Sequence, residues 1–463
     1  MELLKMIIVC GCVPQAEQTM DIFENVSLVG VNNIDKIVEV VEYVINGYNV
    51  KYLKQSKKMT SLNFPKIRKN KFIEIININN GCLGNCTYCK TKFARGDLAS
   101  YQINDIIERI QYVCSQENIK EIWMTSEDTG AYGIDINTNI IKLLEKVLSV
   151  VENSDVMIRL GMTNPPYILK HIKEMCNLLK HKNMYEFIHI PVQSEYIIED
   201  FTFLIDNLRK HVPNITISTD IICGFPFETD EDHKATVNLI KKYKFPVLNI
   251  SQFYPRRGTV AYNMKKINTK IVKLRSRDVT ETFLSYDSNY NFLNGTTQKV
   301  LFTEVSSKSD HIIGHTKQYV KVLLPNNANE NIHLLGTCTN CKIMSTHKWH
   351  VFINQQIVSF NNYSFVATYL LTYLCILYVS TNAMNLRKYI PFFIKIKKKL
   401  KNKKADISTF YILFLHDLKY NIYVFFLFFL TRIYIMHHVT PSYTNKLTIK
   451  KKKKTNKNQI KTE

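Results

Sequence analysis

The sequence has no secretory signal at its start, no internal repeat beyond an alternation of strand-like and helix-like segments, and no apolar run that comfortably spans a bilayer. Without a secretory signal, the 11 cysteines are not expected to form a disulfide framework. We therefore expect a cytoplasmic protein in a reducing compartment, whose thiols either fill the core or bind metal.

The formal net charge of +22 resembles that of a nucleic-acid-binding protein, but about 16 of these charges lie beyond Met384, in a Lys-rich tail. The rest of the chain is only mildly basic. A modest surplus still suits a polyanionic partner, because phosphate contacts need Lys and Arg on one face rather than a large total.

The tail contains two apolar stretches, at residues 365–379 and 422–436, and the second includes Arg432. Each is shorter than the roughly 18 to 20 residues that span a bilayer. One interpretation is a membrane anchor, for example in the endoplasmic reticulum. The other is an unstructured extension rich in Lys, Asn, Ile, Tyr and Phe.

From Phe72 onward, short β-branched runs alternate with segments of helical period. The expected strands are residues 72–79, 121–125, 156–162, 186–191, 215–222 and 247–253. The expected helices are residues 103–116, 139–151, 167–179, 197–211 and 230–242. This alternation predicts an α/β fold with a parallel sheet, and six strands suit a partial (β/α)6 barrel whose loops carry the active site.

A chain of 463 residues is too long for one ordinary domain. We expect a small N-terminal α/β domain with a linker (residues 1–70), the partial barrel (71–293), a small β-barrel (294–360) and the tail (361–463). In the first domain the expected elements are a strand before Gly11, a strand at 26–31 and a helix at 34–48. In the third they are strands at 299–304, 319–324 and 350–358.

Three cysteines, Cys82, Cys86 and Cys89, follow the first expected barrel strand with the spacing C-x3-C-x2-C. Three thiolates on one loop can hold three corners of a [4Fe–4S] cubane and leave the fourth iron without a protein ligand. An open iron can bind S-adenosylmethionine (SAM) through its amino and carboxylate groups. The spacing therefore predicts a cluster that generates a 5′-deoxyadenosyl radical.

Other interpretations of these residues stay open. Zinc prefers four ligands, and no second CxxC or His pair stands near the loop. Tyr88 can offer a flat face to adenine or simply pack as an aromatic side chain. Cys338 and Cys341 are followed by His347 and His350 in a spacing too tight for the common zinc finger, so a turn between strands is expected there.

Four stretches carry a resemblance to the threonylcarbamoyladenosine tRNA methylthiotransferases, a branch of the radical-SAM methylthiotransferases. They are residues 80–92 (NGCLGNCTYCKTK), 95–100 (RGDLAS), 121–133 (EIWMTSEDTGAYG) and 159–166 (RLGMTNPP). The resemblance covers roughly residues 7–325 and is specific to this branch.

The resemblance implies an N-terminal domain with an auxiliary [4Fe–4S] cluster, a radical-SAM partial barrel and a C-terminal β-barrel (TRAM-like) that grips tRNA. The implied reaction is methylthiolation at carbon 2 of N6-threonylcarbamoyladenosine, at tRNA position 37. Sulfur would come from the auxiliary cluster and the methyl group from a second SAM. The implied partners are tRNA and an electron donor, and a monomer is expected.

The resemblance also implies site residues. Cys12, in residues 11–15 (GCVPQ), matches the third cysteine of the auxiliary cluster, whereas Cys10 is expected in the core. The cofactor pocket is expected to involve Tyr88, Ser126, Glu127, Asp128, Thr129, Arg159, Asp220, Gly224 and Glu228. For Ser126 to Thr129 the alternative is a polar helix cap, and for Arg159 it is a buried structural salt bridge.

The sequence departs from the family pattern in four places. Phe227 and Arg257 replace the usual glycine and proline, and about ten residues are missing after Ser194. Two auxiliary cysteines expected upstream of Cys12 are not in this sequence, and one thiolate is not expected to hold that cluster. The alternative hypothesis is therefore an inactive or truncated remnant that binds tRNA or is tethered to a membrane.

Overall fold

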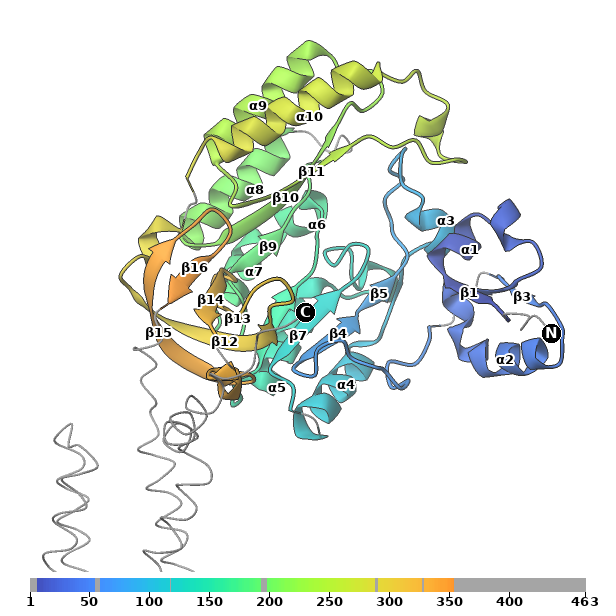
Figure 1. The fold of residues 1–463 in the computed structure, drawn as a ribbon, viewed down its shortest axis with the longest axis horizontal. Coiled ribbons are helices and arrows are strands. Elements are labelled where there is room, and N and C mark those ends of the chain that lie inside the picture. Colours follow the sequence, from blue (N-terminus) through green and yellow to red (C-terminus); the bar gives the residue numbers. More distant parts are fainter. Residues whose placement is uncertain are drawn as a thin grey trace, which may run out of the picture. The chain divides into compact units, whose positions relative to one another are not determined.

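The structure is a computed structural model that describes residues 6–54, 59–116, 118–192, 198–287, 290–326 and 329–353 (Figure 1). All of these belong to one compact unit, residues 1–361. In this described part, no helix is both long and apolar enough to cross a membrane. The anchor predicted for the tail lies outside the described residues.

The N-terminal segment is a small parallel sheet covered by one helix. Its strands are β1 (Ile8–Gly11), β2 (Ser27–Gly30) and β3 (Lys51–Tyr52), with β2 in the middle. Helix α2 (Ile37–Ile45) buries Val40 and Val44 against Val29. Strands β1 and β2 match the two expected strands, and α2 matches most of the expected helix, which begins within a 3-10 helix, Val31–Lys36. Strand β3 was not predicted.

The central segment contains six parallel strands in two three-stranded sheets. The first sheet is β4 (Ile73–Asn77), β7 (Glu121–Thr125) and β8 (Met157–Leu160). The second is β9 (Phe187–His189), β10 (Thr216–Cys223) and β11 (Val247–Gln252). Two isolated parallel bridges, Ile158 to Met184 and Met162 to His189, lie between β8 and β9. The predicted parallel α/β arrangement is confirmed.

Helices connect and cover these strands (Figure 1). They are α4 (Ile103–Gln116), α5 (Ile140–Val151), α6 (Pro165–Leu169), α7 (Ile172–Leu179), α8 (Ile198–His211), α9 (Asp230–Tyr243) and α10 (Thr269–Leu284). The single helix expected at 167–179 is wrong, because the chain breaks it between Leu169 and Ile172. Helix α10 was not predicted; it packs on α9 and β11.

Side chains along each strand point alternately to the two faces of the sheet, and this alternation explains how the helices pack on one face. Ile122 and Met124 on β7 are fully buried in one cluster with Ile106, Ile110 and Leu144 of the covering helices. Each such side chain contributes about 1.5–3 kcal/mol by leaving water. The residues between them, such as Trp123, point to the opposite face of the sheet.

The C-terminal segment is a closed five-stranded barrel, which confirms the predicted β module. Its strands are β12 (Thr297–Val305), β13 (His311–His315), β14 (Lys321–Pro325), β15 (Cys338–Thr346) and β16 (Val351–Ile353). The turn expected at Cys338 to Cys341 is wrong, because both cysteines lie within β15, paired with β12. Strand β13 was not predicted.

Lys317 joins this barrel to the central segment. Its Nζ donates hydrogen bonds to the carbonyl oxygens of Leu179 (3.2 Å), His181 (2.5 Å) and Met184. Nearby, the Glu186 N–H donates to the Lys317 carbonyl at 2.8 Å. Because Glu186 directly precedes β9, this junction lies at the amino end of that strand, away from the carboxyl ends where a site is expected.

Candidate functional site

The cysteine loop leaves the carboxyl end of β4 after the short strand β5 (Asn79–Asn80) and ends at helix α3 (Thr91–Arg95). Cys82, Cys86 and Cys89 are all partly exposed free thiols. Backbone N–H groups point at two of the sulfurs: Gly84 donates to Cys82 Sγ at 3.3 Å, and Thr91 donates to Cys89 Sγ at 3.4 Å. These two sulfurs are thus oriented by the backbone of the loop that carries them.

Gly81 allows this loop to lie close to the following segment. Its φ is +70°, and a Cβ there would lie 2.1 Å from the Asp97 carbonyl oxygen. The Cys82 N–H donates to the Gly96 carbonyl oxygen at 3.3 Å. Only glycine fits this position, and the backbone of the first cysteine is thereby held against the segment at residues 96–97.

Three thiols on one loop are the number of ligands that a [4Fe–4S] cluster with one open iron needs. Among the described residues, no three His, Cys, Asp or Glu side chains converge on one metal position. In a cubane each cysteine binds a different iron, so its ligands do not share one position. Burial raises the pKa of Cys82, and the Gly84 N–H opposes this rise. Bound iron would keep the sulfur deprotonated.

Ser126 and Glu127 follow the carboxyl end of β7 and carry buried polar atoms that lack partners. Ser126 Oγ and Glu127 Oε2 accept or donate no hydrogen bond within the described chain, while Glu127 Oε1 pairs with Arg95 Nε at 2.8 Å. Burial raises the pKa of Glu127, and its charge acts on Cys82. Two unpartnered polar atoms beside the cysteine loop fit the amino and hydroxyl groups of a nucleoside cofactor.

Asp128 and Thr129 use their side chains inside the protein. Asp128 accepts hydrogen bonds from the Gly130 N–H (3.0 Å) and from Asn164 Nδ2 (2.7 Å). Thr129 Oγ1 donates to the Met162 carbonyl at 2.9 Å. Burial raises the pKa of Asp128 to about 6. Both residues therefore tie the ends of β7 and β8 together.

Arg159 stands on β8 among aromatic rings. Its guanidinium carbon lies 4.7 Å from the ring centre of Phe187, 4.9 Å from that of Tyr319 and 5.0 Å from that of Trp123. No ion pair of Arg159 is present among the described residues, so the salt bridge considered as an alternative is not what holds it. Tyr319 belongs to the C-terminal barrel, which places Arg159 near the junction of the two segments.

Asp220 on β10 takes part in a polar row across three strands. Its carboxylate accepts hydrogen bonds from His189 Nε2 of β9 (2.8 Å) and from Asn249 Nδ2 of β11 (2.7 Å). Burial opposes the charged form, but these hydrogen bonds lower the pKa of Asp220 overall. Sequence reasoning missed His189 and Asn249, although both stand at alternating positions of expected strands.

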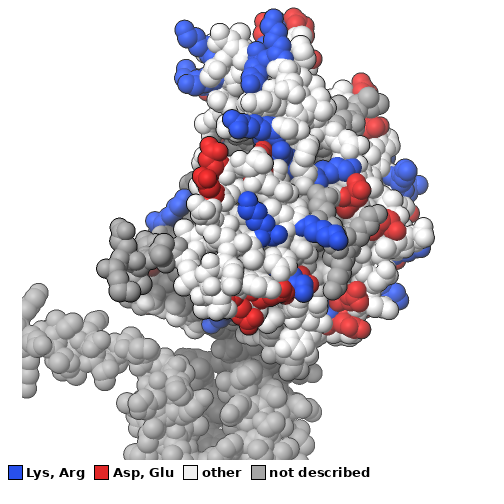
Figure 2. All heavy atoms as spheres, turned by 90° about the vertical axis from the view of Figure 1, so that its right-hand side faces the viewer, with Lys and Arg blue, Asp and Glu red and all other residues white. Residues whose placement is uncertain are grey.

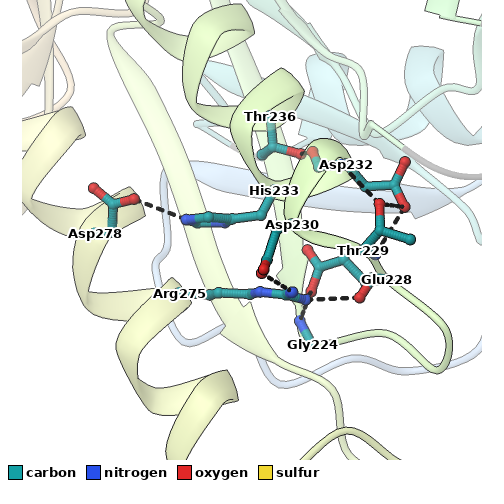
Figure 3. Close-up of polar contacts among 9 residues, drawn as sticks. All are labelled: Gly224, Glu228, Thr229, Asp230, Asp232, His233, Thr236, Arg275 and Asp278. Atoms are coloured by element: carbon teal, nitrogen blue, oxygen red, sulfur yellow. Dashed lines mark hydrogen bonds and ion pairs between the residues drawn. The ribbon is translucent and has the colours of Figure 1, made fainter.

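Gly224 and Glu228 lie in the turn that follows β10 (Figure 3). The Gly224 N–H donates to Glu228 Oε2 at 2.7 Å, and Arg275 Nη1 donates to the same oxygen at 2.8 Å. Glu228 thus has partners within the chain. Arg275 was not among the predicted residues, because its helix, α10, was not predicted.

Tyr88 connects the cysteine loop to the turn after β10. Its ring packs edge-on against Phe225, with ring centres 6.0 Å apart, and Phe225 contacts Phe253 at 5.3 Å. The packing role considered for Tyr88 is therefore present.

Cys12 opens helix α1 (Cys12–Ala16) and is partly exposed. Helix α1 packs against α3, directly after the cysteine loop, and Lys90 Nζ pairs with Glu17 at 3.1 Å. Cys10 is exposed on β1, so the prediction of a core thiol is wrong. Cys12 is thus one free cysteine in the helix that packs against α3, and the described residues do not make up a three-cysteine auxiliary set.

Comparison with known proteins agrees with this geometry. Residues 76–240 match the family model of the Radical SAM superfamily, which includes the cysteine loop, the β7 loop and the turn after β10. The chain thus contains a radical-SAM region, for which a [4Fe–4S] cluster and SAM are the defining cofactors.

Curated relatives specify the branch. The chain is 49% identical to a Homo sapiens threonylcarbamoyladenosine tRNA methylthiotransferase over 70% of this chain and 58% of that protein. It is 44% identical to one from Caenorhabditis elegans (68% of this chain, 76% of that protein). It is 35% identical to a probable one from Pyrococcus abyssi (69% and 78%). The chain belongs to the threonylcarbamoyladenosine tRNA methylthiotransferase family, and it spans 58% of the human relative's length.

Proposed function

We propose that this chain takes part in the methylthiolation of N6-threonylcarbamoyladenosine at tRNA position 37, giving the 2-methylthio derivative. The observation that carries the proposal is the loop of Cys82, Cys86 and Cys89 beside two buried atoms without hydrogen bonds among the described residues, Ser126 Oγ and Glu127 Oε2. Family membership supplies the substrate. Carbon 2 of adenine has no acidic proton, so ordinary acid–base catalysis cannot activate it.

We assign the cluster to Cys82, Cys86 and Cys89, and the polar groups of SAM to Ser126 and Glu127. A reduced [4Fe–4S] cluster with bound SAM supplies the radical that removes a hydrogen atom from an unactivated carbon. The residues of this chain hold three of its corners, and the buried loop after β7 excludes water from the cofactor. We also assign His189, Asp220 and Asn249 to the polar edge of the substrate base.

The six parallel strands support one partial (β/α)6 barrel at residues 71–293, and the closed barrel supports a TRAM-like tRNA-binding domain at 294–360. Residues 1–70 would form the remaining N-terminal domain with Cys12. Figure 2 shows Lys and Arg interspersed with Asp and Glu on the side where α1, α2 and α3 lie. This mixture supports separate phosphate contacts rather than one continuous basic face.

Three further assignments complete the proposal: the protein acts as a monomer, it takes its electron from a separate donor, and residues 361–463 attach it to a membrane. Flotation of the full chain with lipid vesicles tests the last assignment. Binding that survives removal of residues 361–463 would contradict it.

The central experiment is anaerobic reconstitution, with iron and sulfide, of a form of the chain extended by a segment that carries the two auxiliary cysteines expected upstream of Cys12. It is followed by incubation with SAM, dithionite and tRNA that carries the threonylcarbamoyl modification. We expect the 2-methylthio nucleoside in a digest of the tRNA, measured by mass spectrometry. The Cys82→Ala, Cys86→Ala, Cys89→Ala triple variant should lose the brown chromophore and the product. Product formation by the triple variant contradicts the assignment, and tRNA binding without product by the otherwise unaltered extended chain favours a noncatalytic remnant.

A further inference from the structure

Arg275 on α10 holds the turn after β10 with a single guanidinium group (Figure 3). Its Nη1 donates to the Glu228 carbonyl oxygen at 2.9 Å and to Glu228 Oε2 at 2.8 Å. Its Nη2 donates to Asp230 Oδ1 at 2.7 Å. Arg275 is only 7% exposed, so its contacts with the largely buried Glu228 carboxylate are shielded from water, whereas the Asp230 side chain is exposed.

The turn itself is closed and tightly packed. Glu228 Oε2 also accepts from the Gly224 N–H at 2.7 Å, so one carboxylate joins both ends of the turn to Arg275. A Cβ on Gly224 would lie 2.4 Å from Val272 of α10, so the turn lies directly on that helix. Between these points Phe227 has a φ of +67°, a conformation that a bulky residue adopts only when its surroundings enforce it.

The turn is in contact with the cysteine loop. Phe225 packs edge-on against Tyr88, which lies between Cys86 and Cys89, and on its other side contacts Phe253. A continuous set of contacts therefore runs from Arg275 through Glu228 and Phe225 to the loop that carries the three thiols. The hydrogen bonds of Arg275 go to Glu228 and Asp230.

We propose that Arg275 is a positioning residue for the radical-SAM site, which acts through Glu228 to fix the turn that supports the cysteine loop. The inference rests on the cofactor part of the proposed function and not on the transfer of sulfur to tRNA. Loss of the guanidinium should leave the fold intact but misplace SAM relative to the cluster, because displacements near 1 Å are enough to slow a reaction about a hundredfold.

The test combines Arg275→Met with Glu228→Gln. Removing Arg275 alone would leave the largely buried Glu228 carboxylate without its cation and could prevent folding. The amide oxygen introduced by Glu228→Gln can still accept the Gly224 N–H. Arg275→Lys tests whether one donor is enough, since an ammonium cannot bridge Glu228 and Asp230 in the same way. Arg277→Met is the matched control, because Arg277 is exposed on the same helix.

Each reconstituted variant is assayed with dithionite and SAM in the absence of tRNA, for iron content, the electron paramagnetic resonance (EPR) signal with SAM, and 5′-deoxyadenosine formation. We expect the double variant to keep its iron and Tm, to raise the KM for SAM about tenfold, to slow 5′-deoxyadenosine formation up to about a hundredfold, and to change the EPR signal. Arg275→Lys should be intermediate and Arg277→Met unchanged.

The proposal is overturned if the iron-loaded double variant has the KM and the EPR signal of the unaltered chain. It is also overturned if the variant has a lower Tm and a lower kcat at constant KM, because that combination indicates a purely structural role. If the unaltered chain holds iron but does not cleave SAM, the cofactor assignment and this inference both fail. If it cleaves SAM but the extended chain yields no methylthio nucleoside, only the proposed function fails.

Discussion

At the scale of single residues, Glu121 shows how burial changes a carboxyl group. It opens β7 and is completely buried, and Trp123 Nε1 donates to its Oε1 at 2.6 Å. Burial raises the pKa of Glu121 from 4.5 to about 7, although the Trp123 hydrogen bond and the charge of Arg159 oppose the rise. The folded protein therefore keeps a proton that the unfolded chain releases above its ordinary pKa.

We predict that Glu121→Gln stabilises the protein at pH 8 but not at pH 4.5. Between pH 4.5 and about 7 the native state binds more protons than the unfolded state, so wild-type stability falls as the pH rises through this window. The amide side chain of the variant keeps the acceptor for Trp123 and does not titrate. The expected gain at pH 8 is about 2 kcal/mol, measured by denaturant unfolding. The prediction is contradicted if the substitution changes stability equally at both pH values. Glu145→Gln, on the exposed face of α5, is the control.

Phe227 gives a second residue-scale prediction. It is 67% exposed, and its positive φ costs a non-glycine residue about 1–2 kcal/mol. Phe227→Gly and Phe227→Ala both remove the ring, but only glycine relieves the backbone. We expect the glycine variant to be more stable than the alanine variant by roughly 1 kcal/mol in thermal unfolding, after allowing for the entropy of glycine in the unfolded chain. Equal stability of the alanine and glycine variants would show that the turn is not strained.

Residue spacing predicts some site residues and misses others for a physical reason. The cysteines of the loop are within eight residues of each other, so their spacing alone predicts that they can share a cluster. Arg275 is 47 residues from Glu228, and His189 is 31 residues from Asp220. Such pairs form only after strands and helices have packed, so no local sequence pattern predicts them.

At the scale of elements, Lys90 connects three segments next to the cysteine loop. Its Nζ pairs with Glu17, just after α1, and donates to the Arg257 carbonyl oxygen at 2.6 Å, after β11. The ammonium also lies 4.5 Å from the ring centre of Phe93 in α3. Gly258 leaves room for it, since a Cβ there would lie 2.9 Å from Nζ.

We predict that Lys90→Met loosens α1 and the segment after β11 together. Hydrogen exchange should accelerate several-fold at residues 12–17 and 256–263, because the backbone contact and the ion pair are both lost, and remain unchanged in α5. Lys265→Met, an exposed lysine of the same segment, is the control. Faster exchange in only one of the two segments would show that Lys90 does not couple them.

Elements were predictable where their pattern is strong. The strand at 121–125 and the helix at 103–116 were predicted with the bounds the structure gives, because buried apolar residues repeat there with one clear period. The helix expected at 167–179 is two helices, since the backbone turns at Lys170 and His171. Strand β15 begins with Cys-Thr-Asn-Cys, whose polar residues resemble a turn, and only pairing with β12 makes it a strand.

At the scale of the whole described unit, the junction between the central strands and the closed barrel could not be inferred from sequence. Lys317 is a surface residue by type, and its burial follows from three carbonyl oxygens at and beyond the end of α7. The carbonyl of Leu179 ends α7 and those of His181 and Met184 follow it, and the one ammonium brings these three oxygens together. His315 and Tyr319, on either side of it, stack in parallel with ring centres 4.2 Å apart.

We predict that Lys317→Met lets the closed barrel unfold at a lower free energy than the central segment. The methionine keeps the apolar stem but leaves the carbonyl oxygens of Leu179, His181 and Met184 without this donor, at a cost of about 1–3 kcal/mol. Hydrogen exchange should then accelerate in β12, β13 and β14 while β7 and β10 stay protected, because the barrel loses its attachment before the central core opens. Lys321→Met, on the exposed side of β14, is the control. Uniform acceleration across both segments, or none, would mean that the aromatic contacts of Tyr319 with Arg159 and Phe187 hold the junction instead.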